Sequence, residues 1–136
     1  MDLDLAEYSL DALRLSVGGM RLELSRGPYV PGGPDQLTAS IMIERDFSLV
    51  SARGPATIKI DDWAELSQLR PLLGQEVVSA RVSDDGHLIV EFPRHELHVA
   101  PLERYEAWNV AWFDGRLVAS TPGGDLASWF ARNTSP

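Results

Sequence analysis

The segment from Glu76 to Phe130 most constrains the fold, because it reads as short apolar strands separated by tight turns. Glycine takes the positive φ that closes a hairpin more easily than other residues, and Gly86 ends an Asp-Asp-Gly turn. A three-residue loop at 84–86 predicts the apolar cross-strand pairs Val78–Phe92, Ala80–Val90 and Val82–Leu88. A shift by one residue would mix apolar and polar faces, so burial of one face selects this register.

Two further turns extend this antiparallel pattern. Around residues 93–96 the apolar alternation continues onto a third strand, with the predicted pairs Phe92–Leu97, Val90–Val99 and Glu91–His98. A two-residue turn at Asp114-Gly115 predicts another hairpin, with the pairs Trp112–Leu117, Val110–Ala119 and Trp108–Thr121. Two residues further along this ladder, Glu106 lies opposite Gly123.

The first half of the chain adds more strands. Alternating apolar residues predict a hairpin around Gly18-Gly19 and a strand from Leu37 to Ile43, which Phe47 continues beyond a bend. A further short strand is predicted over residues 57–60 from a weaker signal, and residues 1–17 are ambiguous between a strand and a helix. Glycine and proline at 26–35 predict an exposed connection.

Two helices are also predicted. Asp62 is a suitable N-cap for a main helix that Pro71 ends, with an apolar stripe formed by Trp63, Leu66 and Leu69. Asp125 is a suitable N-cap for a short C-terminal helix over Leu126–Arg132. The predicted fold class is therefore α+β: a curved, mainly antiparallel sheet, a meander of hairpins, with one main helix and a short C-terminal helix.

The composition favours one soluble domain over residues 1–136. A chain of 136 residues is long enough to bury a core, and no apolar run approaches the length of a membrane span. The net charge of -8 argues against a nucleic-acid partner and is compatible with a basic protein partner, although acidity also aids solubility. The start of the chain lacks the pattern of a secretory signal, so we expect a cytoplasmic protein.

The sequence contains no recognisable catalytic, cofactor or metal motif. It has no cysteine, and the only metal-like spacing, His95 with His98, places the two side chains on different sides of a turn and strand. The predicted Glu91–His98 pair reads as a surface ion pair. We therefore predict no cofactor, no metal and no catalytic residue.

The sequence Pro122-Gly123-Gly124 precedes the predicted C-terminal helix, where backbone amides could hold an anion. The carboxylates of Asp125 and Glu106 would repel such a ligand. We instead predict a structural motif, in which Glu106 accepts hydrogen bonds from the Gly123, Gly124 or Asp125 amides and locks the final helix onto the sheet.

Four tryptophans could line a ligand pocket, although most large aromatics in a thin sheet belong to the core. These are Trp63, Trp108, Trp112 and Trp129. Trp112 lies next to the predicted hairpin tip of Phe113 and Asp114. An exposed Trp112 beside this tip, together with Phe113 and Asp114, is the best candidate for contact with a protein partner.

The chain resembles a family of small, mainly actinobacterial proteins of unknown function. The resemblance rests on IxIExxF at 41–47, LLGxxV at 72–77, DGxLxxxF at 85–92, YEAW at 105–108 and PGGxLAxW at 122–129. The third strand of the meander departs from it, with Arg94-His95 in place of an acidic-Gly turn, and the first 36 residues show no match to it. The resemblance implies no enzymatic activity. It implies that the gene lies near a gene for a secreted toxin and that the protein acts as an immunity-type binder.

The leading hypothesis is a non-enzymatic protein-binding module, such as an immunity protein that neutralises a cognate toxin. The alternative is a small-ligand binder or enzyme that uses a tryptophan-lined cleft with Glu106. A third possibility is a domain that dimerises through an edge strand. The sequence leaves the partner, the binding face and the oligomeric state open.

Overall fold

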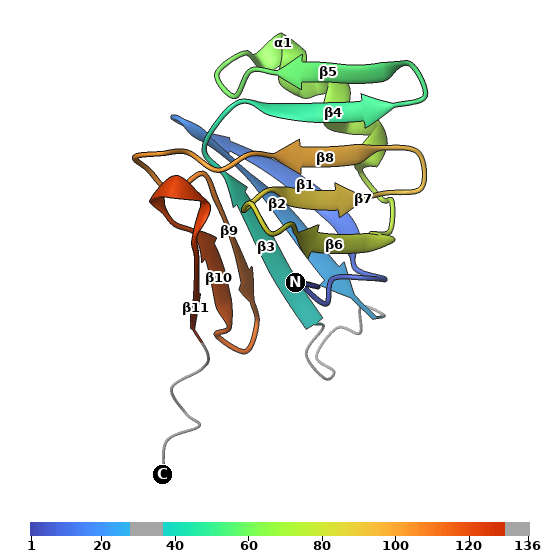
Figure 1. The fold of residues 1–136 in the computed structure, drawn as a ribbon. Helices are drawn as coiled ribbons and strands as arrows, with labels where there is room; N and C mark the ends of the chain where they lie inside the picture. The colour runs from blue at the N-terminus through green and yellow to red at the C-terminus, as the bar shows by residue number, and fades with distance from the viewer. Residues whose placement is uncertain (28–36, 130–136) are drawn as a thin grey trace.

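The computed structural model describes residues 1–27 and 37–129, and within these ranges the chain forms two antiparallel sheets, with one short α-helix (Figure 1). The first sheet has the order β1 (Ser9–Ser16), β2 (Gly19–Arg26), β3 (Leu37–Ile43), β9 (Trp108–Trp112), β10 (Leu117–Ser120) and β11 (Leu126–Trp129). The second has the order β5 (Gly54–Ile58), β4 (Phe47–Ser51), β8 (Glu96–Val99), β7 (Leu88–Glu91) and β6 (Ser79–Val82). We call them the six-stranded and the five-stranded sheet.

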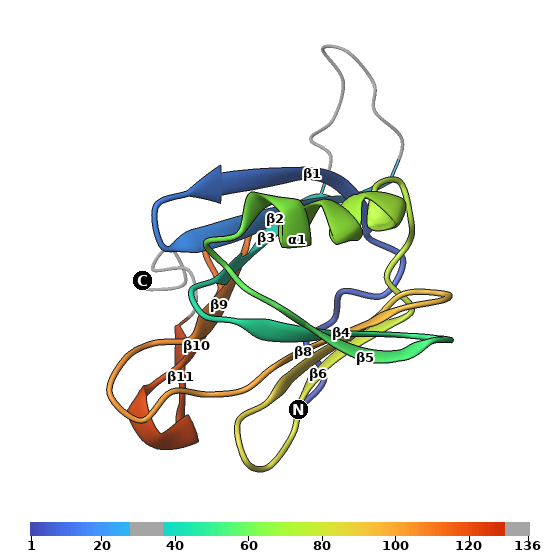
Figure 2. The ribbon, with the colours of Figure 1, turned by 90° about the horizontal axis from the view of Figure 1, so that it is seen from above.

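The two sheets form separate layers, and their strands run across one another (Figures 1 and 2). The inner faces supply the core, which alternation along the strands had predicted. Fully buried side chains include Leu22, Ile41 and Trp108 of the six-stranded sheet, and Leu88 and Leu97 of the five-stranded sheet. The meander is therefore split into two packed layers and is not one curved sheet.

The predicted turn at 84–86 is confirmed. Ala80 pairs with Val90 and Val82 with Leu88, while Gly86 has a φ of 85°. Val78, however, is 55% exposed and lies before β6, so its predicted place on the apolar face is wrong.

The predicted register of β7 and β8 is wrong by two residues. Val90 pairs with Leu97, His98 lies opposite Ile89, and Glu91 lies opposite Glu96. The amide of Phe92 donates to the His95 carbonyl oxygen at 2.7 Å, so the loop contains only Pro93 and Arg94 and is shorter than the predicted turn at 93–96. A two-residue shift leaves each side chain on the same face, and the apolar face is preserved.

The predicted register of β9 and β10 is wrong by one residue. Leu117 pairs with Ala111 and Val118 with Val110. The amide of Trp112 donates to the Arg116 carbonyl oxygen at 2.9 Å, so the loop has three residues, 113–115. This register buries Val118 completely and leaves Leu117 on the outer face of the sheet.

The main helix starts where predicted. The Asp62 carboxylate accepts from the Ala64 and Glu65 amides, and α1 (Trp63–Leu66) continues into the 3-10 helix η1 (Ser67–Leu72). Leu66, Leu69 and Leu72 are buried, but Trp63 is 74% exposed, so its predicted place in the apolar stripe is wrong. Figure 2 shows α1 and η1 between the two layers, beneath β1 and β2.

The predicted C-terminal helix is wrong, because Leu126–Trp129 forms strand β11, which pairs with β10. Before it, η2 (Pro122–Gly124) makes a tight turn that the Thr121 amide closes by donating to the Asp125 carbonyl oxygen at 2.7 Å. Asp125 itself has extended backbone angles and returns the chain to the sheet. Residues 130–132 of the predicted helix lie outside the described residues.

The N-terminal region, which the sequence left open between strand and helix, contains strand β1 and, within the described residues 1–17, no helix. The predicted hairpin is confirmed as β1 and β2, although its turn is Val17-Gly18 rather than Gly18-Gly19. Residues before β1 run along the edge of the five-stranded sheet, where the Leu3 amide donates to the Ala80 carbonyl oxygen at 2.9 Å. The connection predicted at 26–35 lies largely outside the described residues.

Candidate functional site

The turn between β6 and β7 packs directly against the turn that contains η2. A Cβ atom added to Gly86 would lie 2.4 Å from the Gly124 carbonyl oxygen, and one added to Gly124 would lie 2.9 Å from that of Asp85. Trp108 is fully buried, and its indole Nε1 donates to the Gly86 carbonyl oxygen at 3.2 Å. We call Gly86, Trp108 and Gly124 the glycine junction. It ties a turn of one sheet to a turn of the other.

The predicted hydrogen bonds from the glycine amides to Glu106 are absent among the described residues, so that part of the predicted motif is wrong. The Gly123 amide donates to the Leu102 carbonyl oxygen at 2.9 Å, and the Gly124 amide donates to that of Thr121 at 3.1 Å. Both amides therefore have backbone partners already.

Glu106 instead lies exposed, just before β9. Its Oε1 accepts a hydrogen bond from Asn109 Nδ2 at 2.8 Å. The prediction failed because it relied on the incorrect β9–β10 register and on a helix at Asp125. The Asp125 carbonyl oxygen, rather than its carboxylate, closes the turn.

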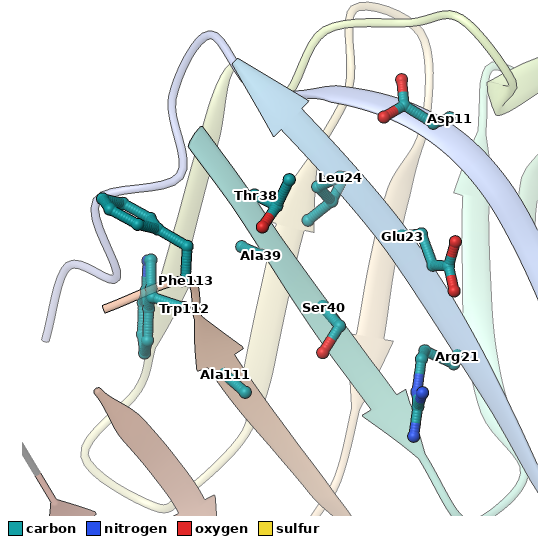
Figure 3. Close-up of a pocket in the computed structure, with 10 residues that line it drawn as sticks. All are labelled: Asp11, Arg21, Glu23, Leu24, Thr38, Ala39, Ser40, Ala111, Trp112 and Phe113. Carbon is teal, nitrogen blue, oxygen red and sulfur yellow. The ribbon is translucent and has the colours of Figure 1, made fainter. Parts of the chain in front are cut away.

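The outer face of the six-stranded sheet carries a shallow groove of about 330 Å³ (Figure 3). Its lining comes from β1, β2, β3 and β9 and includes two carboxylates, one guanidinium and two hydroxyl groups. These belong to Asp11, Glu23, Arg21, Thr38 and Ser40. We call this feature the sheet groove.

The tip of the β9–β10 hairpin stands at one end of the sheet groove (Figure 3). Phe113 is 55% exposed, while its amide donates to the Thr38 carbonyl oxygen at 2.9 Å. Asp114 accepts a hydrogen bond from the Arg116 amide at 3.0 Å. These hydrogen bonds fix the loop that carries the exposed aromatic ring, and a loop that is already ordered loses little entropy on binding.

Trp112 was predicted as an exposed contact, but it is only 8% exposed. Arg116 stacks over its ring with the guanidinium carbon 4.3 Å from the ring centroid, and Arg116 Nη1 also lies 3.2 Å from Asp4 Oδ2. These contacts hold residues 1–8, which we call the N-terminal segment, against the hairpin. Trp112 therefore supports the tip from beneath, and Phe113 and Asp114 form its exposed part.

The N-terminal segment beside the tip carries charge and backbone strain. Asp4 and Glu7 both have positive φ, 55° and 71°, a conformation that non-glycine residues rarely adopt. Arg26 Nη2 lies 2.8 Å from Glu7 Oε2 and so holds this segment on β2. Burial raises the pKa of the Tyr8 phenol, and the negative charges of Asp114 and Asp4 raise it further against the opposing effect of Arg26.

His87 and His98 line the same shallow pocket, whereas His95 lines a different one. His98 Nε2 lies 2.7 Å from Glu96 on the same strand, and His87 Nδ1 lies 3.0 Å from Asp85 in the neighbouring turn. Hydrogen bonding from Ser83, with a smaller contribution from His87, lowers the pKa of the exposed Asp85 carboxyl. Among the described residues, no group of three or more histidine, cysteine or acidic residues is arranged to hold a metal ion.

Trp63, Trp108 and Trp112 are also separated from one another and from Glu106. Trp63 lines a cleft between β1 and the helices, Trp112 lines the sheet groove, and Trp108 is buried at the glycine junction. Glu106 lines neither the cleft nor the groove.

In the described part of the chain, no helix has the length and apolar character needed to cross a membrane.

Comparison with known proteins places this fold in a family. A search of curated proteins and a search of solved structures each returned no match. A family model, described as a family of unknown function (DUF6188), matches residues 1–130. The match thus includes the first 36 residues, where the sequence motifs gave no resemblance. Since it spans nearly the whole chain, the protein belongs to the DUF6188 family of unknown function.

Proposed function

We propose that this protein is a non-enzymatic module that binds another protein through the sheet groove and the β9–β10 tip. The observation that carries the proposal is Phe113, a large aromatic side chain that is 55% exposed on a loop held by backbone hydrogen bonds. Aromatic residues presented in this way are enriched among residues that dominate binding energy. Little ordering entropy is lost when the loop is already fixed.

The charge around the tip favours a basic partner. Asp4, Glu7, Asp11 and Asp114 are exposed around the sheet groove and the adjoining N-terminal segment. Two of them pair with arginines of this chain, but the whole protein retains a net charge of -8. Such a surface attracts a cationic protein at long range and repels nucleic acid.

We further propose that the partner is a toxin domain that this protein neutralises in the cytoplasm, as an immunity protein would. The groove alone is too small for a stable interface, which buries about 800 Å² on each side. The contact would therefore extend over the groove, the hairpin tip and the N-terminal segment. Their outward-facing carboxylates suit occlusion of a basic surface better than chemistry on a small substrate.

Co-expression with the product of an adjacent gene tests the proposal. We expect a complex that survives size-exclusion chromatography, with a dissociation constant that weakens as salt is raised. Phe113→Ala should weaken binding about tenfold or more, whereas Tyr105→Ala, which removes another exposed aromatic ring, should not.

A growth assay tests the finer proposal of immunity. Expression of the wild-type protein should restore growth to cells that express the adjacent toxin, and Phe113→Ala should restore it less. The protein-binding proposal fails if no complex forms at micromolar concentrations. If a complex forms without restoring growth, the immunity proposal alone fails.

A further inference from the structure

An apolar cleft of about 240 Å³ opens between β1 and the helices, on the core side of the six-stranded sheet and away from the sheet groove. Its lining includes Leu13 and Leu15 of β1, Met20 of β2, Trp63 and Leu66 of α1, and Arg70 of η1. We call it the leucine cleft. It is the place where α1 and η1, rather than the five-stranded sheet, face β1 (Figure 2).

The cleft exists because the helices cover β1 incompletely. Leu13 and Leu15 pair with Leu22 and Met20, which are fully buried, yet both β1 leucines are only partly buried. Trp63, at the mouth of the cleft, is 74% exposed. Apolar surface at this position would be stabilised by an apolar group that replaces water.

Arg70 gives the cleft its chemical character. It is the only charged residue of the lining, and its guanidinium makes no hydrogen bond or ion pair with another residue in the described ranges. The sheet groove differs, because it contains charges of both signs. An arginine at the edge of an apolar site is suited to a carboxylate, which it can bind through two parallel hydrogen bonds.

We propose that the leucine cleft binds a small amphipathic carboxylate, with its apolar chain between β1 and α1 and its carboxylate at Arg70. The cleft volume is just below the range of about 300–1,000 Å³ typical of sites for drug-sized ligands. A short acyl chain or a single aromatic ring therefore fits better than a larger ligand. The negative charge of the ligand is matched by a cation that has no other partner in the described structure.

Octanoate is a direct probe, because Trp63 reports on the cleft. We expect saturable binding, with a blue shift of tryptophan emission as Trp63 loses contact with water, and Trp63→Phe should remove this signal. Calorimetry should still detect binding to Trp63→Phe, because the reporter is not the ligand's charged partner. Octanoate should also raise the melting temperature of the wild-type protein.

Two arginine variants separate the roles of charge and position. Arg70→Gln should lower octanoate affinity about tenfold or more, and it should leave the weaker binding of neutral octanamide unchanged. Arg14→Gln is the matched control, because Arg14 is an exposed arginine of β1 whose Nε pairs with Glu23 and which does not line the cleft. It should bind octanoate like the wild type.

The proposal is overturned if octanoate fails to bind at millimolar concentration or binds Arg70→Gln as tightly as Arg14→Gln. It is equally overturned if chemical-shift changes map outside the cleft, or if only an apolar side chain of a protein partner occupies it. Circular dichroism of each variant checks that it is folded. Phe113→Ala should leave octanoate binding intact, so this test is independent of the proposed protein interface.

Discussion

The two ends of strand β9 carry tryptophans with opposite surroundings. Trp108 is completely buried, and its indole donates a hydrogen bond to Gly86 at the glycine junction. Trp112 lies beneath the hairpin tip, where its indole nitrogen is buried without a hydrogen-bond partner among the described residues and Arg116 covers its ring. One end therefore fastens the two sheets together, while the other supports an exposed aromatic residue. We therefore expect the first end to contribute mainly to stability, and the second is the end that we propose for recognition.

The largest expected effect is at the glycine junction. Gly124→Ala should lower the free energy of unfolding by about 2–5 kcal/mol, because a left-handed alanine is strained and its Cβ would meet the Asp85 carbonyl oxygen and the Pro101 ring. Gly123→Ala is the matched control, since Gly123 also has positive φ but no atom within 4 Å of an added Cβ. It should cost about 1–2 kcal/mol, measured by urea unfolding. Equal losses would show that the contact contributes nothing.

The next effect concerns Trp108. Trp108→Phe should lower the free energy of unfolding by about 2–4 kcal/mol, because it leaves the Gly86 carbonyl oxygen unsatisfied and opens a cavity. Trp63→Phe, at a 74% exposed position, should change it by less than about 0.5 kcal/mol. Similar losses in the two variants, compared by thermal unfolding, would contradict the role of the buried indole.

A smaller effect is expected at Glu106, which lies next to β9 but outside the junction. Glu106→Gln should change the free energy of unfolding by less than about 0.5 kcal/mol, because its hydrogen bond to Asn109 is exposed to solvent. A loss above about 1.5 kcal/mol in urea unfolding would instead support the original prediction of a charge-assisted lock.

The smallest effect on stability is expected at the other end of β9. Phe113→Ala should leave the melting temperature within about 2 °C of the wild-type value, since the side chain projects into solvent and its backbone amide still reaches Thr38. Its whole effect should appear in partner binding. A large fall in melting temperature would mean that the tip is part of the fold, and the contrast between the two ends of β9 would disappear.

Local signals predicted the parts of the fold that depend on neighbouring residues. The Asp62 cap, the turn ending at Gly86 and the alternation of Leu37–Ile43 each carry their own chemical reason, and each is confirmed. The β9–β10 register was predicted wrongly, because Asp114-Gly115 fits a two-residue loop as well as the three-residue loop that forms. The spacing of Leu126 and Trp129 suits a helix, yet pairing with β10 decides the structure.

The candidate sites were less accessible from sequence. The glycine junction joins turns of different sheets, so no local sequence pattern predicts that Gly86 packs against Gly124. Exposure of Phe113 could be expected from its place at a hairpin tip, whereas burial of Trp112 depends on stacking by Arg116 and on the N-terminal segment. The leucine cleft depends on how far α1 stands from β1, which alternation cannot reveal.

The order of the strands has a consequence for folding kinetics. The five-stranded sheet is continuous in sequence, from β4 to β8, and separates β3 from β9, which pair in the other sheet. This sheet is thus an insert between β3 and β9. Arg45 connects the two ends of the insert, since its Nη1 donates to the Pro101 carbonyl oxygen at 2.9 Å. The entropy cost of bringing β3 and β9 together falls sharply once the residues between them are compact. Strand β3 should therefore acquire its partner β9 late, and the transition state should contain the insert before the six-stranded sheet is complete.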